Sequence, residues 1–290
     1  MRRSVNSLET NPNSGRKLFF GLFIFPLLIT VGMAVLLCGA VLLTTERETP
    51  ETLIAAIKSG SPGKRWQKAF ELSNELNRSK NSLRSQSLLS EMAYILRDGD
   101  HYDTKTRSYM AVALAHFRGD KGAVGALRTA LRDTNDEIKL YALWSLGQLG
   151  ARSASAEIIP FLNSEDSNLK EMSAYVLGAL GDTSAVPGLL ALLREPSANI
   201  RWNAALSLAR LGDGSGASVL MEMLDRRALA QLGISGQQAE EMMINATKGL
   251  ALIRNEESIR ILKGLAQDDE SLKVRQAAMN ALQYRETQEA

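Results

Sequence analysis

The chain has 290 residues, enough for one or two domains, and 45% of them are hydrophobic, mostly Leu and Ala. Aromatic residues make up only 6% and there are only seven prolines, so the composition favours helices over strands. Cys38 is the single cysteine, which excludes an intramolecular disulfide and a Cys-based zinc site, and the formal net charge is only +2.

The first predicted element is a membrane anchor over residues 18–43. This run has no charged residue, exceeds the roughly 20 residues that span a bilayer, and is longer than the apolar core of about 7 to 15 residues in a signal peptide. Basic residues gather before it, which places residues 1–17 in the cytoplasm as a tail. We therefore expect a single-pass inner-membrane protein with everything after the span in the periplasm. Ala34 and Cys38 form a small-xxx-small pair, a weak signal for self-association through this helix.

A repeat follows the predicted anchor. Four glycines are spaced 31 residues apart, and small and apolar residues follow the same step: Gly119, Gly150, Gly181 and Gly212. A fixed period of 20–50 residues is typical of solenoids, whose units bury their apolar faces by stacking. We predict a linker and N-terminal capping helix over 44–62, about six repeats plus a partial terminal unit over 63–283, and a polar tail over 284–290.

Each unit is predicted to contain two helices. In "NIRWNAALSLARLGDGSGASVLMEMLD" apolar residues recur every three or four positions, Gly212 supplies the left-handed residue that ends the first helix, and Asp213 or Ser215 caps the second. Pro187 fits the first turn of a second helix, whereas Pro160 is expected to shorten or kink one. Two units are longer by 11 residues, with insertions spread over 78–103 and near 226–240.

These patterns resemble HEAT repeats, of the bacterial type also seen in phycobilisome bilin-lyase subunits. The segments that carry the resemblance are "LKEMSAYVLGALGDTSAVPGLLALL" (169–193), "IRWNAALSLARLGD" (200–213) and "LKVRQAAMNAL" (272–282). The resemblance implies an all-α fold, a right-handed α-α superhelix of the HEAT-type α-solenoid, here with one N-terminal transmembrane helix. Ala151 in place of the turn Asp and Arg118 before Gly119 depart from the pattern.

No catalytic, cofactor-binding or metal-binding set is recognisable in the sequence. His101 and His116 are the only histidines, and they form neither the His-Glu pairs of HEAT-type di-iron hydroxylases nor an HExxH pattern. Phosphate-loop and nucleophile-elbow motifs are also missing. Residues 44–290 carry 30 basic and 31 acidic residues, a net charge of −1, which argues against a nucleic-acid partner. We expect no cofactor and no enzymatic activity.

The candidate interaction residues are basic or aromatic. Residues 57–133 hold 14 basic and 8 acidic residues, net +6, and this half could face anionic lipid headgroups or an acidic partner, or be an ordinary mixed surface. Three basic residues share one repeat position and form either an exposed ladder or local hydrogen bonds to the acidic inter-repeat turns. Two tryptophans are exposed anchors or partly buried. The candidates are Arg65, Trp66, Lys68, Lys105, Arg107, Lys139, Lys170, Arg201 and Trp202.

The sequence thus predicts a membrane-anchored scaffold that presents a protein-binding surface as an accessory subunit of a bacterial envelope complex. Its partner is a protein whose identity the sequence does not give. Two alternatives remain open: a HEAT-like enzyme of the bilin-lyase or DNA-glycosylase type, and an adaptor that faces the cytoplasm.

Overall fold

The computed structural model describes residues 24–44, 48–78, 85–253 and 255–289. The chain divides into two compact units, residues 1–49 and residues 50–290, and each is described by itself. The described residues form helices and no strand.

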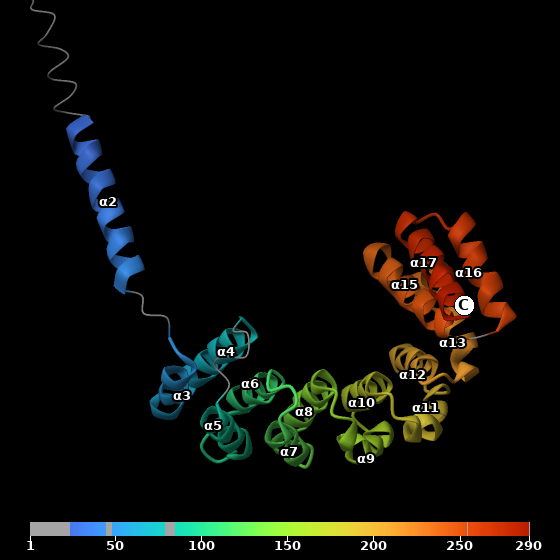
Figure 1. Ribbon diagram of the computed structural model, residues 1–290, viewed down its shortest axis with the longest axis horizontal. Helices are drawn as coiled ribbons and strands as arrows, with labels where there is room; N and C mark the ends of the chain where they lie inside the picture. The colour runs from blue at the N-terminus through green and yellow to red at the C-terminus, as the bar shows by residue number, and fades with distance from the viewer. Residues whose placement is uncertain (1–23, 45–47, 79–84, 254, 290) are drawn as a thin grey trace, which may run out of the picture. The chain divides into compact units, whose positions relative to one another are not determined.

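The first unit contains helix α2 (Phe25–Thr44), drawn in blue in Figure 1. Among the described residues, no helix combines the length and the apolar content needed to cross a membrane. The predicted anchor over 18–43 is therefore not supported, nor is self-association through it, and the predicted single-pass, periplasm-facing localisation is wrong. The prediction rested on 26 charge-free residues. Residues 18–23 of this run lie outside the described residues.

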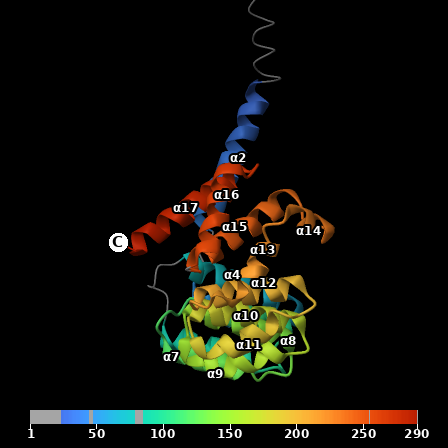
Figure 2. The same cartoon turned by 90° about the vertical axis from the view of Figure 1, so that its right-hand side faces the viewer.

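The second unit is a curved stack of helices in two layers (Figures 1 and 2). The inner layer consists of α4 (Pro62–Arg78), α6 (Thr104–Leu114), α8 (Asp136–Leu149), α10 (Ser167–Leu180), α12 (Ala198–Arg210), α15 (Gly236–Leu252) and α17 (Leu272–Glu289). The outer layer consists of α3 (Pro50–Ser59), α5 (Gln86–Arg97), α7 (Lys121–Ala130), α9 (Ser155–Ile158) with η3 (Ile159–Asn163), α11 (Val186–Leu192), α13 (Ala217–Glu222) and α16 (Glu256–Asp268). Successive inner helices pack side by side, each also against an outer helix. This arrangement confirms the predicted all-α solenoid.

The turns between the two layers use the predicted glycines. All four have positive φ, between 65° and 82°, which is the left-handed region that a side chain disfavours. Aspartates that follow them cap the next turn: Asp182 accepts from the backbone N–H of Ser184 at 3.1 Å, and Asp213 from that of Ser215 at 2.8 Å. At the position where these units have aspartate, Ala151 makes no side-chain cap.

The core is built from the small and apolar columns of the repeat. Ala111, Ala142, Ser173 and Ala204 are fully buried, in agreement with the predicted close stacking of hairpins. Gly178 makes one of the close contacts: a Cβ there would clash with the side chain of Ser207 on the next inner helix and lie 2.7 Å from its Cα. Small residues therefore set the spacing of the inner layer.

Irregular segments appear where the sequence departs from the repeat. Pro160 lies in the 3₁₀ helix η3, which replaces the continuation of α9, as expected from its position. Pro187 lies in the first turn of α11. The insertion near 226–240 forms a short extra helix, α14 (Arg226–Gln231), before α15 begins. Residues 284–289, predicted as a polar tail, continue helix α17.

Candidate interaction surface

Three of the predicted residues meet where α4 faces α6. The ammonium of Lys105 lies over the ring of Trp66, 5.4 Å from its centroid, and the guanidinium of Arg65 lies 5.1 Å from the centroid of Tyr102. Arg65 also donates from Nε to the carbonyl of Gly60 at 2.9 Å. These cations are partly satisfied by aromatic faces of the same chain, an interaction of about 0.5–1 kcal/mol at exposed sites.

Arg107 is a structural residue. Its side chain is buried, its Nε donates to the carbonyl of Leu96 at 2.8 Å, and its guanidinium forms an ion pair with Asp133. A buried guanidinium with these partners is not available to a ligand. Lys68 is paired at 2.7 Å with Glu71, one turn along the same helix.

The three basic residues at one repeat position all bind within the chain. Lys139 pairs with Asp136 at 2.6 Å and Lys170 pairs with Glu195 at 2.7 Å. Arg201 donates to the carbonyl of Glu195 at 3.0 Å. The Lys139 pair lies within the first turn of α8, whereas Lys170 and Arg201 both bind Glu195 in the turn before α12, so all three side chains have partners in the chain.

Trp202 lies in the core and not on the surface. It is 3% exposed, and its Nε1 is buried with no hydrogen-bond partner among the described residues. An unpaired buried donor costs about 1–3 kcal/mol. Trp202 also lines a pocket of about 510 Å³ together with Glu171 of α10.

Glu171 is a titratable side chain in that pocket, and the pKa of its carboxyl is shifted. Burial raises the pKa of its carboxyl, and the amide of Asn203, which donates at 3.1 Å, offsets only part of this rise. No sequence signal marked Glu171, because only the structure shows that its helix position faces a pocket.

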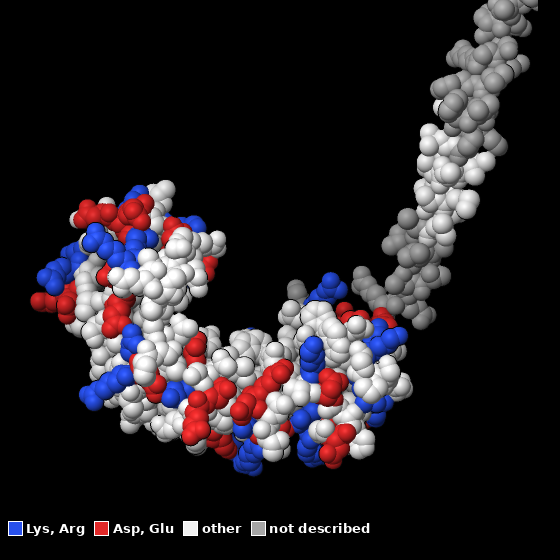
Figure 3. All heavy atoms as spheres, turned by 180° about the vertical axis from the view of Figure 1, so that it is seen from behind, with Lys and Arg blue, Asp and Glu red and all other residues white. Residues whose placement is uncertain are grey.

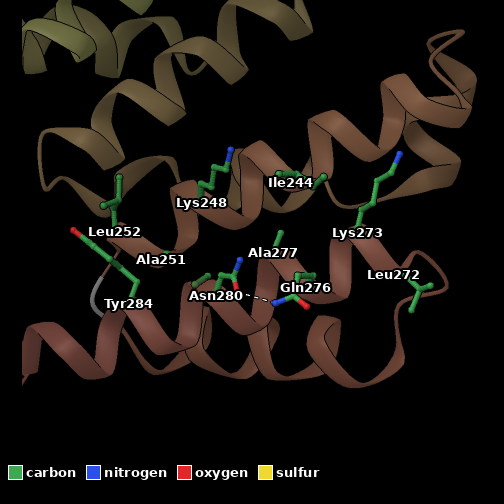
Figure 4. Close-up of a pocket in the computed structure, with 11 residues that line it drawn as sticks. Ile244, Lys248, Ala251, Leu252, Leu272, Lys273, Gln276, Ala277, Asn280 and Tyr284 are labelled. Atoms are coloured by element: carbon green, nitrogen blue, oxygen red, sulfur yellow. Dashed lines mark hydrogen bonds between the residues drawn. The ribbon is translucent and has the colours of Figure 1, made fainter.

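A larger groove of about 710 Å³ lies between α15 and α17, at the C-terminal end of the stack. Figure 4 shows Ile244 and Lys248 on α15 and Gln276 and Asn280 on α17 around the same space. Its lining is mostly apolar and includes three alanines and two exposed side chains: Ala251, Ala277, Ala281, Leu272 (73% exposed) and Tyr284 (49% exposed). None of the predicted interaction residues lines this groove.

Charged side chains are mixed on the face of the molecule that Figure 3 shows. Figure 3 shows Lys and Arg interspersed with Asp and Glu along the stack rather than separated into blocks. Within the described part of the chain, no group of three or more His, Cys, Asp or Glu residues is placed to hold a metal ion. The groove between α15 and α17 and the pocket lined by Glu171 and Trp202 are candidate binding sites.

The described helices form an all-α solenoid with a HEAT-like fold. Residues 155–235 match the family model described as HEAT repeats. No curated protein matches the chain.

The solved structures similar to this chain include the complex of CpcE and CpcF of phycocyanin lyase from Nostoc sp. PCC7120. The match has 22% sequence identity and a TM-score of 0.53, and it covers 83% of this chain and 96% of the chain in that structure. An archaeal HEAT-like repeats protein from Thermococcus onnurineus NA1 shares 16% identity over 84% of this chain and 99% of that chain, with a TM-score of 0.45. Human deoxyhypusine hydroxylase shares 16% identity over 82% and 89%, with a TM-score of 0.35. At 22% identity the likeness to the phycocyanin lyase complex concerns the fold alone.

Proposed function

We propose that this chain is a binding scaffold that docks a segment of a partner protein in the groove between α15 and α17. The observation that carries the proposal is the groove itself, an apolar cleft of about 710 Å³ on a face where Leu272 and Tyr284 remain exposed. Contiguous exposed apolar surface with a polar rim is typical of interaction sites. The complex of CpcE with CpcF supports a protein partner for a fold of this kind.

The occupant that fits the groove is an amphipathic helix with acidic flanks. Alanines on its floor allow a close approach, and apolar residues at i, i+3, i+4 and i+7 of a partner helix suit a groove between two helices. Lys248 and Lys273 lie on the rim. Lys273 pairs with Glu240 at 3.2 Å but keeps a largely exposed side chain. The rim is therefore complementary to carboxylates beside the apolar stripe.

We propose a binding role in preference to a catalytic one. The cationic residues at one repeat position and Arg107 act within the fold. The groove offers amides and lysines around an apolar floor, an arrangement suited to recognition.

Labelled amphipathic helical peptides test the proposal by fluorescence anisotropy. A peptide with Asp and Glu beside its apolar stripe is expected to bind at least about tenfold more tightly than the same peptide with Lys at those positions, a difference of about 1.4 kcal/mol. Asn280→Trp, which fills the groove from its exposed rim, is expected to abolish binding. Gln267→Trp on α16 is the matched control, because Gln267 is exposed and does not line the groove. Equal binding of both peptides, or full binding by Asn280→Trp, contradicts the proposal.

A further inference from the structure

The pocket lined by Trp202 and Glu171, called the Glu171 pocket below, lies where the inner layer passes from α12 to α15. It has a volume of about 510 Å³, and Glu171 of α10 forms part of its wall. Leu232 and Ile234 line it from the segment that follows α14, so the insertion that lengthens this repeat forms part of its wall. Leu232 is 56% exposed. The insertion thus helps to form a pocket beside an acidic side chain.

The carboxylate of Glu171 has no cationic partner among the described residues. Its hydrogen bond comes from the neutral amide of Asn203, and burial of the carboxyl is the main cause of its raised pKa. The nearest cations along the chain are committed elsewhere, since Lys170 pairs with Glu195 and Arg201 binds that residue's carbonyl. Half-buried carboxylates are normally paired. A positive charge in the pocket would supply the missing partner.

The rest of the lining indicates what carries that charge. Leu206 and Met242 provide apolar walls. Asn199, Gln238 and Asn245 add exposed amides whose side chains form no hydrogen bond within the described part of the chain. A side-chain amide offers both a donor and an acceptor, as the peptide bond does. The ligand chemistry is therefore an ammonium or guanidinium on an aliphatic stem, attached to peptide groups.

We propose that the Glu171 pocket binds the lysine or arginine side chain of an extended segment of a partner protein. The inference rests on the proposed scaffold function. It adds a second contact point for the partner, separate from the α15–α17 groove. The cation pairs with Glu171, the aliphatic stem lies against Leu206 and Met242, and the amides bind the adjacent backbone.

The indole N–H of Trp202 has no hydrogen-bond partner among the described residues. Trp202 lines the same pocket, and its Nε1 is buried. Because Trp202 lines the pocket, binding is expected to shift its indole resonance. The variants Trp66→Phe and Trp144→Phe remove the other two tryptophan signals in turn and so identify that resonance.

The test titrates the full chain with the pentapeptide Ac-Ala-Ala-Lys-Ala-Ala-NH₂ and monitors the indole resonances. Its norleucine analogue and free n-butylamine are the comparison probes. The lysine peptide is expected to bind at least about tenfold more tightly than either probe and to shift the Trp202 resonance. Glu171→Gln keeps the shape of the side chain and is expected to remove this preference. Glu165→Gln is the matched control, an exposed glutamate outside the pocket.

Equal affinity for the lysine and norleucine peptides overturns the inference, as does full binding by Glu171→Gln. If n-butylamine binds as tightly as the peptide, the pocket takes a free amine, and the assignment to a protein segment is overturned. Asn280→Trp blocks the groove and leaves the pocket intact, so the lysine peptide is expected to bind this variant normally. If the acidic helical peptide binds the chain but the lysine peptide does not, only this inference is contradicted. If the lysine peptide binds but the acidic helical peptide does not, only the proposed groove is contradicted.

Discussion

The spacing of the inner helices depends on Gly178 in the middle of α10. The substitution Gly178→Ala adds a Cβ that would lie 2.7 Å from the Cα of Ser207, closer than non-bonded carbon atoms come in folded proteins. The added Cβ would also clash with Oγ and Cβ of Ser207. Rotation about χ1 moves Oγ but neither Cβ nor Cα, so it cannot relieve the contact. Helices α10 and α12 must move apart, which disturbs the buried hydrogen bond from Ser207 Oγ to the carbonyl of Ala174 at 2.8 Å.

Three contributions set the expected change in the free energy of unfolding. Overpacking a close contact destabilises by about 1–3 kcal/mol. Weakening the buried hydrogen bond of Ser207 removes about 1 kcal/mol. Replacing glycine by alanine within a helix returns about 1 kcal/mol through helix propensity. The net loss is about 1–3 kcal/mol, which corresponds to a melting temperature lower by about 2–12 °C in a unit of this size.

Thermal unfolding followed by circular dichroism measures this change, with Gly264→Ala as the matched control. Gly264 is also within a helix, α16, but a Cβ there meets nothing within 4 Å. This control is expected to gain up to about 1 kcal/mol, because only the propensity contribution remains. A melting temperature that changes in the same direction for both variants would refute the reasoning from helix spacing.

Three further predictions use the same assay. Asp182→Ala is expected to lose about 0.5–2 kcal/mol of stability, because its carboxylate caps the turn before α11; a change within error contradicts the capping role. Arg107→Ala is expected to lose about 3–5 kcal/mol because it leaves a part-buried acid unpaired, whereas Lys139→Ala at an exposed pair loses less than about 1 kcal/mol; equal losses contradict this. Burial raises the pKa of Glu171, so its ionised form disfavours folding above that pKa and the penalty disappears as the pH falls through it. Glu171→Gln should therefore raise the melting temperature at pH 7.5 and lose this advantage in acid; a pH-independent effect contradicts the assignment.

Much of the fold could be predicted because the repeat places local signals in register. Gly150 and Gly212 have the left-handed backbone that their spacing predicted, and Asp213 caps the turn that follows. Pro160 shortens its helix because proline has no backbone N–H and a fixed φ. These signals are local, so a single sequence reveals them without any knowledge of tertiary contacts.

The binding surfaces could not be predicted in this way. The groove floor is made of alanines such as Ala277, and alanine also fills the tightly packed columns of the repeat, so the sequence does not distinguish a gap from a contact. The sequence suggests that Arg107 is a surface cation, but in the structure it is buried and binds Leu96 and Asp133. Trp202 has the residue type of an interaction anchor but is buried in the core. Each of these outcomes depends on contacts between repeats.

The predicted membrane anchor shows the limit of composition as a signal. A charge-free run predicts how favourably a segment would enter a bilayer, but it does not give the bounds of the helix. No helix within the described ranges is long and apolar enough to span, so the charge-free run alone is not sufficient evidence for an anchor.

The central claim, that a partner protein docks between α15 and α17, is tested most directly by site-specific photo-crosslinking in cells that produce the chain. A photoreactive amino acid replaces Gln276 in the groove or, as a matched position, Gln267 on α16. The account predicts a covalent adduct of one defined mass with another protein from position 276 and none from position 267, and loss of that adduct when Asn280→Trp is added. Adducts of equal yield from both positions, or adducts only with a second copy of this chain, would contradict it.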